Sequence, residues 1–309
     1  MAVLALTSAK GAPGVSTAAL AMTLLWPRAA LLAECDPAGG SSVLAGYLRG
    51  TVEHSRGLLP LALAQHHEAL EQALWPQTVP LTGDPHAASV AAGAGDRWLL
   101  PGLSDAAQAP STAALWGPLG SVLASLERAG TDVIVDAGRL GTAHAPTALL
   151  RQADLVLLVM GTNLPAVAAA KARLNLLRED LSVTGTVTGT AGRRDGYLSS
   201  LGLLLVGAGR PYSAKEISAA CGVPVVACLA WDPASAEVLA AGATPGRSFE
   251  ASPLVRSTRA AISASHELIR QRRDRLAPPM PAASIPAAPV PAAPSIVERL
   301  LGRDAANDA

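Results

Sequence analysis

The sequence predicts an α/β domain with a doubly wound, mostly parallel sheet and helices on both faces. Short apolar runs alternate with longer stretches rich in Ala and Leu, a pattern typical of buried parallel strands and the helices that cover them. Half of the 309 residues are apolar, yet only 3% are aromatic, so the core must be built mainly from Ala, Val and Leu. A chain of this length lies near the upper limit for one hydrophobic core.

The apolar runs and the stretches rich in Ala and Leu predict where strands and helices lie along the chain. Strands are expected near residues 2–7, 29–34, 97–100, 132–136, 154–159, 202–206 and 224–229. Helices are expected near residues 16–25, 57–74, 112–129, 163–178, 213–220, 234–241 and 254–274. Right-handed crossovers bring the carboxyl ends of parallel strands to one edge of the sheet, where ligands bind in folds of this class. We therefore expect the functional residues at that edge.

The composition also divides the chain into three parts. Residues 1–276 form the predicted domain, and residues 277–294 are almost entirely Pro and Ala. Such a segment is typical of a semi-rigid linker of polyproline type. Residues 295–309 form a short tail.

The first predicted strand leads into a glycine-rich loop and then into a helix. The loop runs Lys10-Gly11-Ala12-Pro13-Gly14-Val15-Ser16-Thr17. In this geometry the backbone N–H groups and the positive end of the helix dipole bind phosphate. The usual motif ends in Gly-Lys-Ser/Thr, whose lysine contacts the β- and γ-phosphates and whose hydroxyl binds magnesium. Here Val15 replaces that lysine. The alternative interpretation is an ordinary loop before a helix that Ser16 caps.

Two later strands end in acidic residues. The strand near residues 29–34 leads into Glu34-Cys35-Asp36-Pro37, and the strand near residues 132–136 ends in Asp136. A carboxylate at such a strand end is typical of a magnesium site beside a phosphate-binding loop, although Asp is also a common turn residue. The order and spacing of the loop and the two acids favour the functional interpretation.

Together these segments resemble the ParA/MinD family of P-loop ATPases, whose deviant loop reads Lys-Gly-Gly-x-Gly-Lys-Ser/Thr. Five loop residues match that pattern: Lys10, Gly11, Gly14, Ser16 and Thr17. Ala12 and Val15 depart from it, because the family has Gly and a second Lys there. Glu34 stands where the family has an Asp, and residues 207–210 (Gly-Ala-Gly-Arg) stand where the family has an adenine-contacting Asn. The resemblance extends over residues 1–270.

The resemblance implies a role for each matching residue. ATP or ADP with Mg²⁺ would be the cofactor, bound by residues 10–17. Ser16 and Asp136 would hold the magnesium ion, and Asp36 would orient the attacking water. Lys10 would reach across a homodimer to the partner's nucleotide. Because Val15 removes a charge-assisted contact, typically about 1.5–3 kcal/mol, we expect weak nucleotide binding and slow or absent hydrolysis.

Three functional interpretations follow from the resemblance. The first is a degenerate member that positions or assembles a pilus or secretion apparatus, like the TadZ/CpaE branch, whose phosphate loops are often degenerate. The second is an active ParA-like ATPase that partitions a chromosome, a plasmid or another cargo. The third is a structural pseudo-ATPase that binds no nucleotide. Val15 and the missing adenine-contacting Asn favour the first interpretation over the second.

Charge and composition bear on partners and location. The formal net charge is zero, which argues against a dedicated nucleic-acid-binding protein. One basic run at residues 270–275 suits the end of a helix, and the sharper alternative is weak contact with DNA phosphates or anionic lipid. No basic segment precedes the apolar start, and no apolar stretch reaches the ~20 residues of a membrane span. We expect a cytoplasmic protein.

The tail offers a means of recruitment. Four apolar residues within residues 295–303 share one helical face: Ile296, Val297, Leu300 and Leu301. A short tethered helix of this kind would dock in a groove of a protein partner or attach peripherally at the inner face of the membrane. Two turns bury too little apolar area for stable membrane attachment on their own. The alternative is a frayed tail with incidental Leu residues.

Overall fold

The computed structural model describes residues 3–11, 13–81, 96–182 and 200–276. Residues Met1–Asp274 form one compact unit. Loop residue Ala12, the linker at 277–294 and the tail at 295–309 lie outside the described residues, so the predictions made for them stay predictions. Within the described ranges, no helix combines the length and the apolar character that crossing a membrane requires.

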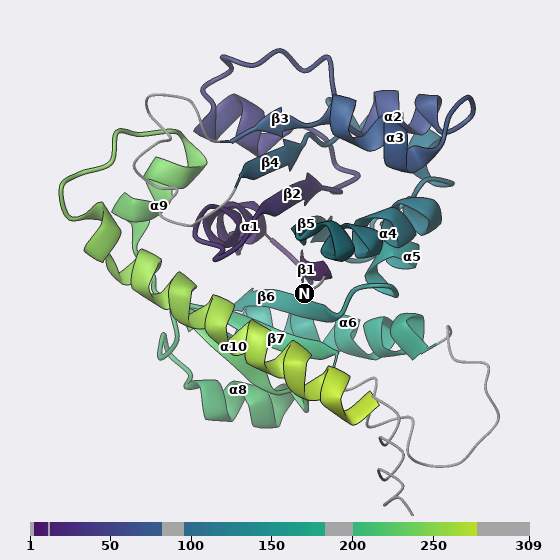
Figure 1. Cartoon of the computed structure of the whole chain (residues 1–309). Helices are drawn as coiled ribbons and strands as arrows, with labels where there is room; N and C mark the ends of the chain where they lie inside the picture. Colours follow the sequence, from purple (N-terminus) through teal and green to yellow (C-terminus); the bar gives the residue numbers. More distant parts are fainter. Residues whose placement is uncertain (1–2, 12, 82–95, 183–199, 277–309) are drawn as a thin grey trace, which may run out of the picture. The chain divides into compact units, whose positions relative to one another are not determined.

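The centre of the compact unit is a sheet of eight strands (Figure 1). The strands are β1 (Val3–Ser8), β2 (Ala30–Glu34), β3 (Val79–Pro80), β4 (Arg97–Leu100), β5 (Asp132–Arg139), β6 (Leu155–Gly161), β7 (Leu201–Val206) and β8 (Val225–Leu229). Their order across the sheet is β3-β4-β2-β5-β1-β6-β7-β8. The two-residue β3 pairs antiparallel to β4, and the other pairs are parallel. The predicted fold class is confirmed.

Helices connect the parallel strands. They are α1 (Val15–Leu24), α2 (Leu58–Ala64), α3 (Leu70–Leu74), α4 (Trp116–Ser125), α5 (Thr147–Leu150), α6 (Leu164–Ser182), α8 (Ala214–Cys221), α9 (Pro233–Ala240) and α10 (Pro253–Leu276). A π-helical turn, Val43–Tyr47, follows β2. Crossovers of this kind place helices on both faces of a parallel sheet.

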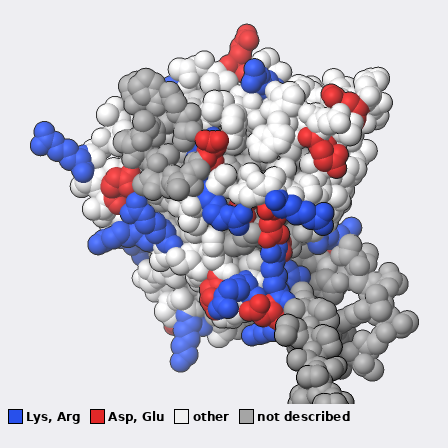
Figure 2. Space-filling view, in the orientation of Figure 1, with Lys and Arg blue, Asp and Glu red and all other residues white. Residues whose placement is uncertain are grey.

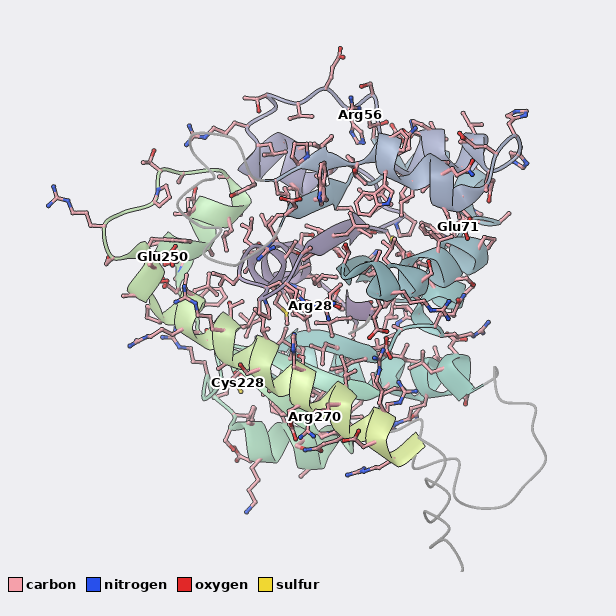
Figure 3. All side chains as sticks on the ribbon, in the orientation of Figure 1. Arg28, Arg56, Glu71, Cys228, Glu250 and Arg270 are labelled. Atoms are coloured by element: carbon pink, nitrogen blue, oxygen red, sulfur yellow. The ribbon has the colours of Figure 1, made fainter. Side chains whose placement is uncertain are left out.

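Alternating strand residues serve two separate cores. On β1, Val3 and Ala5 face a core that α2, α3, α4, α5, α6 and α8 cover. Leu4 and Leu6 face a second core, which α1, α9 and α10 cover. Figure 3 shows how side chains fill the space between the sheet and its helices. Both faces of the inner strands β1, β2, β5, β6 and β7 are buried, as their continuous apolar sequences predicted, whereas the outer strand β8 is mostly half-buried.

The structure also differs from the predicted elements. The single helix expected at 57–74 is two short helices, α2 and α3, because the polar residues at 65–68 between them offer no apolar face to the core. The short helix α5 and strand β3 were not predicted. A strand of two residues is too short to show an alternating pattern.

The basic run at 270–275 is largely neutralised by neighbouring acids. Arg270 pairs with Glu267 and with Asp274 on the same helix. Arg273 reaches Glu127 and Asp154 on other elements. Figure 2 shows Lys and Arg interspersed with Asp and Glu on the face that carries α10. Arg273 therefore ties this end of α10 to Glu127 and Asp154, and contact of the run with DNA phosphates or anionic lipid stays a prediction.

Candidate functional site

Two glycines in the loop between β1 and α1 have left-handed backbone conformations. Gly11 and Gly14 adopt φ angles of 75° and 92°, a left-handed conformation that residues with a Cβ rarely adopt. A Cβ added at either glycine would meet no atom within 4 Å, so the backbone is open to close approach by a ligand. Gly14 is the N-cap of α1, and no side chain caps that helix. The alternative in which Ser16 caps the helix is therefore wrong.

The two predicted acids converge beside this loop. Asp136 is 3% exposed near the end of β5, and its carboxylate accepts hydrogen bonds from the Ser16 hydroxyl and, at 2.9 Å, from the Gly138 N–H. Strand β2 runs beside β5, and the Cys35 N–H donates to the Asp136 carbonyl at 2.7 Å. Asp36 follows directly, and its carboxylate lies against Gly138. Ser16, Asp36 and Asp136 thus meet at one edge of the sheet.

Opposing effects act on the pKa of the buried Asp136 carboxyl. Burial raises the pKa of Asp136, and the nearby charge of Asp36 raises it further. The hydrogen bonds from Ser16 and from the Gly138 backbone act in the opposite direction and lower the pKa. Both effects that raise the pKa oppose the charged form. A cation bound by Asp136 would favour its charged form.

Glu34 has a structural position that the sequence did not reveal. Its buried carboxyl accepts hydrogen bonds from the Ser41 hydroxyl, from the Val43 N–H at 3.3 Å and from the Gly102 N–H at 3.2 Å. Desolvation nevertheless raises the pKa of Glu34 to about 7. Glu34 therefore ties the segment after β2 to the segment after β4. It does not line the pocket beside the phosphate loop.

A pocket of about 310 Å³ joins the loop to the acids. Eight of the predicted site residues line it: Gly11, Pro13, Gly14, Val15, Ser16, Thr17, Asp36 and Asp136. Lys10 is not among the lining residues; it is exposed and makes no ion pair with the rest of the described chain. Residues that the sequence analysis missed also line the pocket, among them Ser42, Arg139 and Leu239.

A second pocket of about 320 Å³ adjoins the first. Both pockets share the loop residues Pro13, Gly14 and Thr17. The second is mostly apolar and lies at the carboxyl ends of β7 and β8, where Val206 and Trp231 line it. Trp231 is 60% exposed. Two adjoining pockets therefore open beside the glycine loop, and the second is the more apolar of the two.

Known structures show the same fold. The chain is similar to a ParA family ATPase from Chlorobium tepidum, with a TM-score of 0.59 and 16% identity over 86% of this chain and 99% of that one. It is similar to MinD from Pyrococcus horikoshii in complex with Mg-ADP, with a TM-score of 0.59 and 16% identity over 87% of this chain and 98% of that one. It is also similar to the ATP complex of the McdA variant D38A from Cyanothece, with a TM-score of 0.59 and 16% identity over 86% and 96% of the two chains.

Comparisons of the sequence alone identify no relative. Neither a scan against protein-family models nor a search of curated proteins returned a relative. The similarity therefore lies in the course of the backbone, which covers nearly the whole length of the structures compared. The chain has the fold of the ParA/MinD-type P-loop ATPases.

Proposed function

We propose that the protein is a ParA/MinD-like nucleotide-binding protein that acts as a positioning or assembly factor and hydrolyses ATP slowly or not at all. The observation that carries the proposal is the meeting of Ser16, Asp36 and Asp136 beside a loop with two open, left-handed glycines. That arrangement fits a nucleotide with Mg²⁺, because it offers backbone N–H donors to phosphate and oxygen ligands to the metal.

Each residue then has a distinct role. The N–H groups of residues 13–17 hold the phosphates at the start of α1, where the helix dipole favours negative charge. The Ser16 hydroxyl and the Asp136 carboxylate would hold the magnesium ion, which would supply electrostatic stabilisation of the phosphate oxygens. Asp36 orients the water that attacks the terminal phosphate. Lys10, exposed at the head of the loop, reaches the nucleotide of a partner subunit in a homodimer.

Val15 weakens this site. Its hydrocarbon side chain offers no donor to phosphate, and it is only 8% exposed and belongs to the core that α1 covers. Hydrogen bonds to charged groups contribute about 1.5–3 kcal/mol each, which corresponds to a tenfold to hundredfold difference in affinity. A site of this strength suits a protein in which nucleotide binding governs dimerisation more than turnover.

The positioning role rests on the fold and on the tail. The MinD of Aquifex aeolicus, a structure with a TM-score of 0.55 to this chain, was solved as a complex with MinC. A comparable protein partner here would be recruited by residues 295–303, with a pilus or secretion apparatus as the cargo. Fluorescent fusions of the full chain and of a chain without residues 295–309 test this role in the native host. Identical localisation would contradict it.

An active partitioning ATPase is the second candidate, because both Asp36 and Asp136 line the pocket. Turnover separates the two. We expect isothermal titration to detect weak binding of Mg-ATP, and Ser16→Ala and Asp136→Asn to abolish it. Ser263→Ala, an exposed serine on α10, is the matched control and should bind as the wild type does.

A turnover of ~1 s⁻¹ or more would favour the active ATPase, and Asp36→Ala should then remove it while binding persists. Absence of any Mg-ATP binding by the folded wild type would overturn both candidates and leave the structural pseudo-ATPase.

A further inference from the structure

The end of β5 contains an irregularity that changes which side chains face the phosphate loop. Leu6 pairs with Asp136, but Ser8, two residues further along β1, pairs with Arg139, three residues further along β5. One extra residue is therefore inserted in β5 between these pairs. Bulges of this kind are common beside active sites, where they redirect a side chain.

The bulge has a physical cause in Gly138. Its φ of 60° lies in the left-handed region, and a Cβ at this position would collide with the carboxyl of Asp36. The Gly138 carbonyl accepts a hydrogen bond from the Thr7 hydroxyl at 3.0 Å, and the Leu140 N–H donates to the Ser8 carbonyl at 2.8 Å. These contacts fix the bulge on both sides.

The consequence concerns Arg139. In a regular strand Gly138 would lie opposite Ser8 and share a face with Asp136, because side chains alternate with a period of two. The inserted residue puts Arg139 in that place instead. Arg139 lines the same pocket as Ser8, Ser16 and Asp136. It is the only Lys or Arg among the described residues that line this pocket.

Arg139 is also not engaged by another part of the described chain. Its side chain forms no hydrogen bond or ion pair with the described part of the chain, and the side chain is exposed. Arg270 and Arg273 on α10, by contrast, each pair with two acids. An exposed guanidinium that has no acidic partner and lines the pocket beside the glycine loop suits an anionic ligand such as phosphate.

We infer that Arg139 supplies the phosphate-binding cation that Val15 has removed from the loop. The inference rests on the proposed nucleotide site, and it assigns to Arg139 the charge-assisted contact with phosphate that Val15 cannot make. Arginine suits the role because its planar guanidinium donates two parallel hydrogen bonds to phosphate oxygens and keeps its charge. Its position on β5, rather than in the loop, would couple phosphate binding to the segment that follows Asp136.

The test compares the affinity of purified variants for Mg-ATP and for inorganic triphosphate with magnesium, by isothermal titration. Arg139→Ala should weaken both by about tenfold to a hundredfold, because both ligands carry the phosphate chain. Arg139→Lys should retain part of the affinity. The matched control is Arg128→Ala, an exposed arginine that precedes β5 at the opposite edge of the sheet, which should bind as the wild type does.

A double-mutant cycle tests whether Arg139 takes the place of the missing loop lysine. Val15→Lys should raise affinity more in the Arg139→Ala background than in the wild type, because the lysine then fills an unoccupied role. Equal gains in both backgrounds, or an Arg139→Ala protein that binds within twofold of the wild type, would overturn the inference while leaving the proposed function intact. A folded wild type that binds neither ligand would overturn both. Circular dichroism confirms that each variant remains folded.

Discussion

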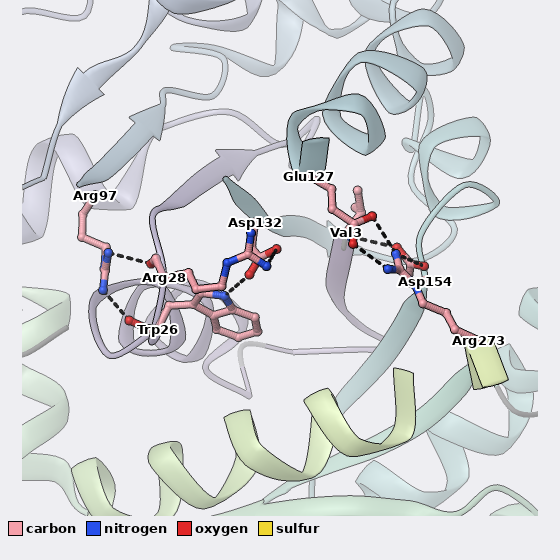
Figure 4. Close-up of polar contacts among 8 residues, drawn as sticks. All are labelled: Val3, Trp26, Arg28, Arg97, Glu127, Asp132, Asp154 and Arg273. Atoms are coloured by element: carbon pink, nitrogen blue, oxygen red, sulfur yellow. Dashed lines mark hydrogen bonds and ion pairs between the residues drawn. The ribbon is translucent and has the colours of Figure 1, made fainter. Parts of the chain in front are cut away.

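The two edges of the sheet arrange their charged groups in opposite ways. At the amino ends of the strands, acids are paired within the chain (Figure 4). Asp154, just before β6, accepts from the Val3 N–H at 3.0 Å and lies 3.1 Å from an Arg273 nitrogen. Asp132, the first residue of β5, accepts from Trp26 Nε1 at 2.9 Å and lies 3.7 Å from Arg28.

At the carboxyl ends of the same strands, acids lie close together and cations have no acidic partner. Asp36 and Asp136 are neighbours whose charges oppose each other, while Lys10 and Arg139 form no ion pair with the described chain. Both Asp132 and Asp136 belong to β5, so the difference does not come from the strand. Charged groups are therefore paired within the described chain at the amino ends of the strands, whereas at the carboxyl ends they have the unpaired arrangement that the proposed nucleotide site requires.

The largest expected effect is a loss of stability on mutation at the amino ends of the strands. Asp132→Ala removes a fully buried carboxylate and leaves the Trp26 indole N–H and the Arg28 guanidinium without that acceptor. The buried Trp26 donor loses its partner, which costs about 1–3 kcal/mol, whereas the Arg28 side chain is 44% exposed and stays hydrated. We expect the free energy of unfolding in urea to fall by that amount, while the affinity for Mg-ATP of the folded protein stays unchanged. A loss of affinity in the folded variant would show that the two edges are not independent.

A second effect appears in the pH dependence of stability. Because the pKa of Glu34 is raised from 4.5 to about 7, the native state binds more protons than the unfolded state between these values. The contribution of Glu34 to the free energy of unfolding is then fully present below pH 4.5 and is lost as the pH rises to 7, by up to about 3 kcal/mol at 1.36 kcal/mol per pKa unit. Glu34→Gln resembles the protonated form and should flatten this part of the profile. An unchanged slope would contradict the assignment.

A smaller effect is expected at the carboxyl ends of the strands, where the bulge in β5 lies. Gly138→Ala must strain a left-handed residue, which costs roughly 1–2 kcal/mol, and its Cβ must displace the Asp36 carboxyl. We expect a modest loss in thermal stability together with weaker binding of Mg-ATP, because the bulge and the acid move together. Gly130→Ala, another left-handed glycine far from the pocket, serves as the control for strain alone. Equal binding by both variants would contradict a role of the bulge in the site.

The sequence predicted the fold well for physical reasons that are local. Strands buried on both faces leave continuous apolar runs, and a glycine loop followed by a helix is recognisable from residue types alone. The positions of Ser16, Asp36 and Asp136 followed because parallel strands bring their carboxyl ends to one edge. Their roles toward magnesium and water stay predictions.

Other parts of the site depend on tertiary geometry and left no readable signal. Arg139 reaches the pocket because one residue is inserted in β5 relative to β1, and a register shift between distant strands is not visible in either strand's sequence. Gly138 was the available hint, since glycine within a strand often marks a bulge. Glu34 resembled a site residue in sequence, but its three donors come from segments that only folding brings together.

The most direct test of the account is a comparison of one substitution at each edge, read by two measurements. Isothermal titration gives the affinity for Mg-ATP, and urea unfolding without nucleotide gives stability. Asp136→Asn should lose Mg-ATP binding while its stability is maintained or rises, because burial opposes the charge of Asp136 and the amide carries none. Asp132→Ala should show the reverse. An Asp136→Asn protein that binds Mg-ATP as tightly as the wild type would contradict the claim that this edge is a nucleotide site.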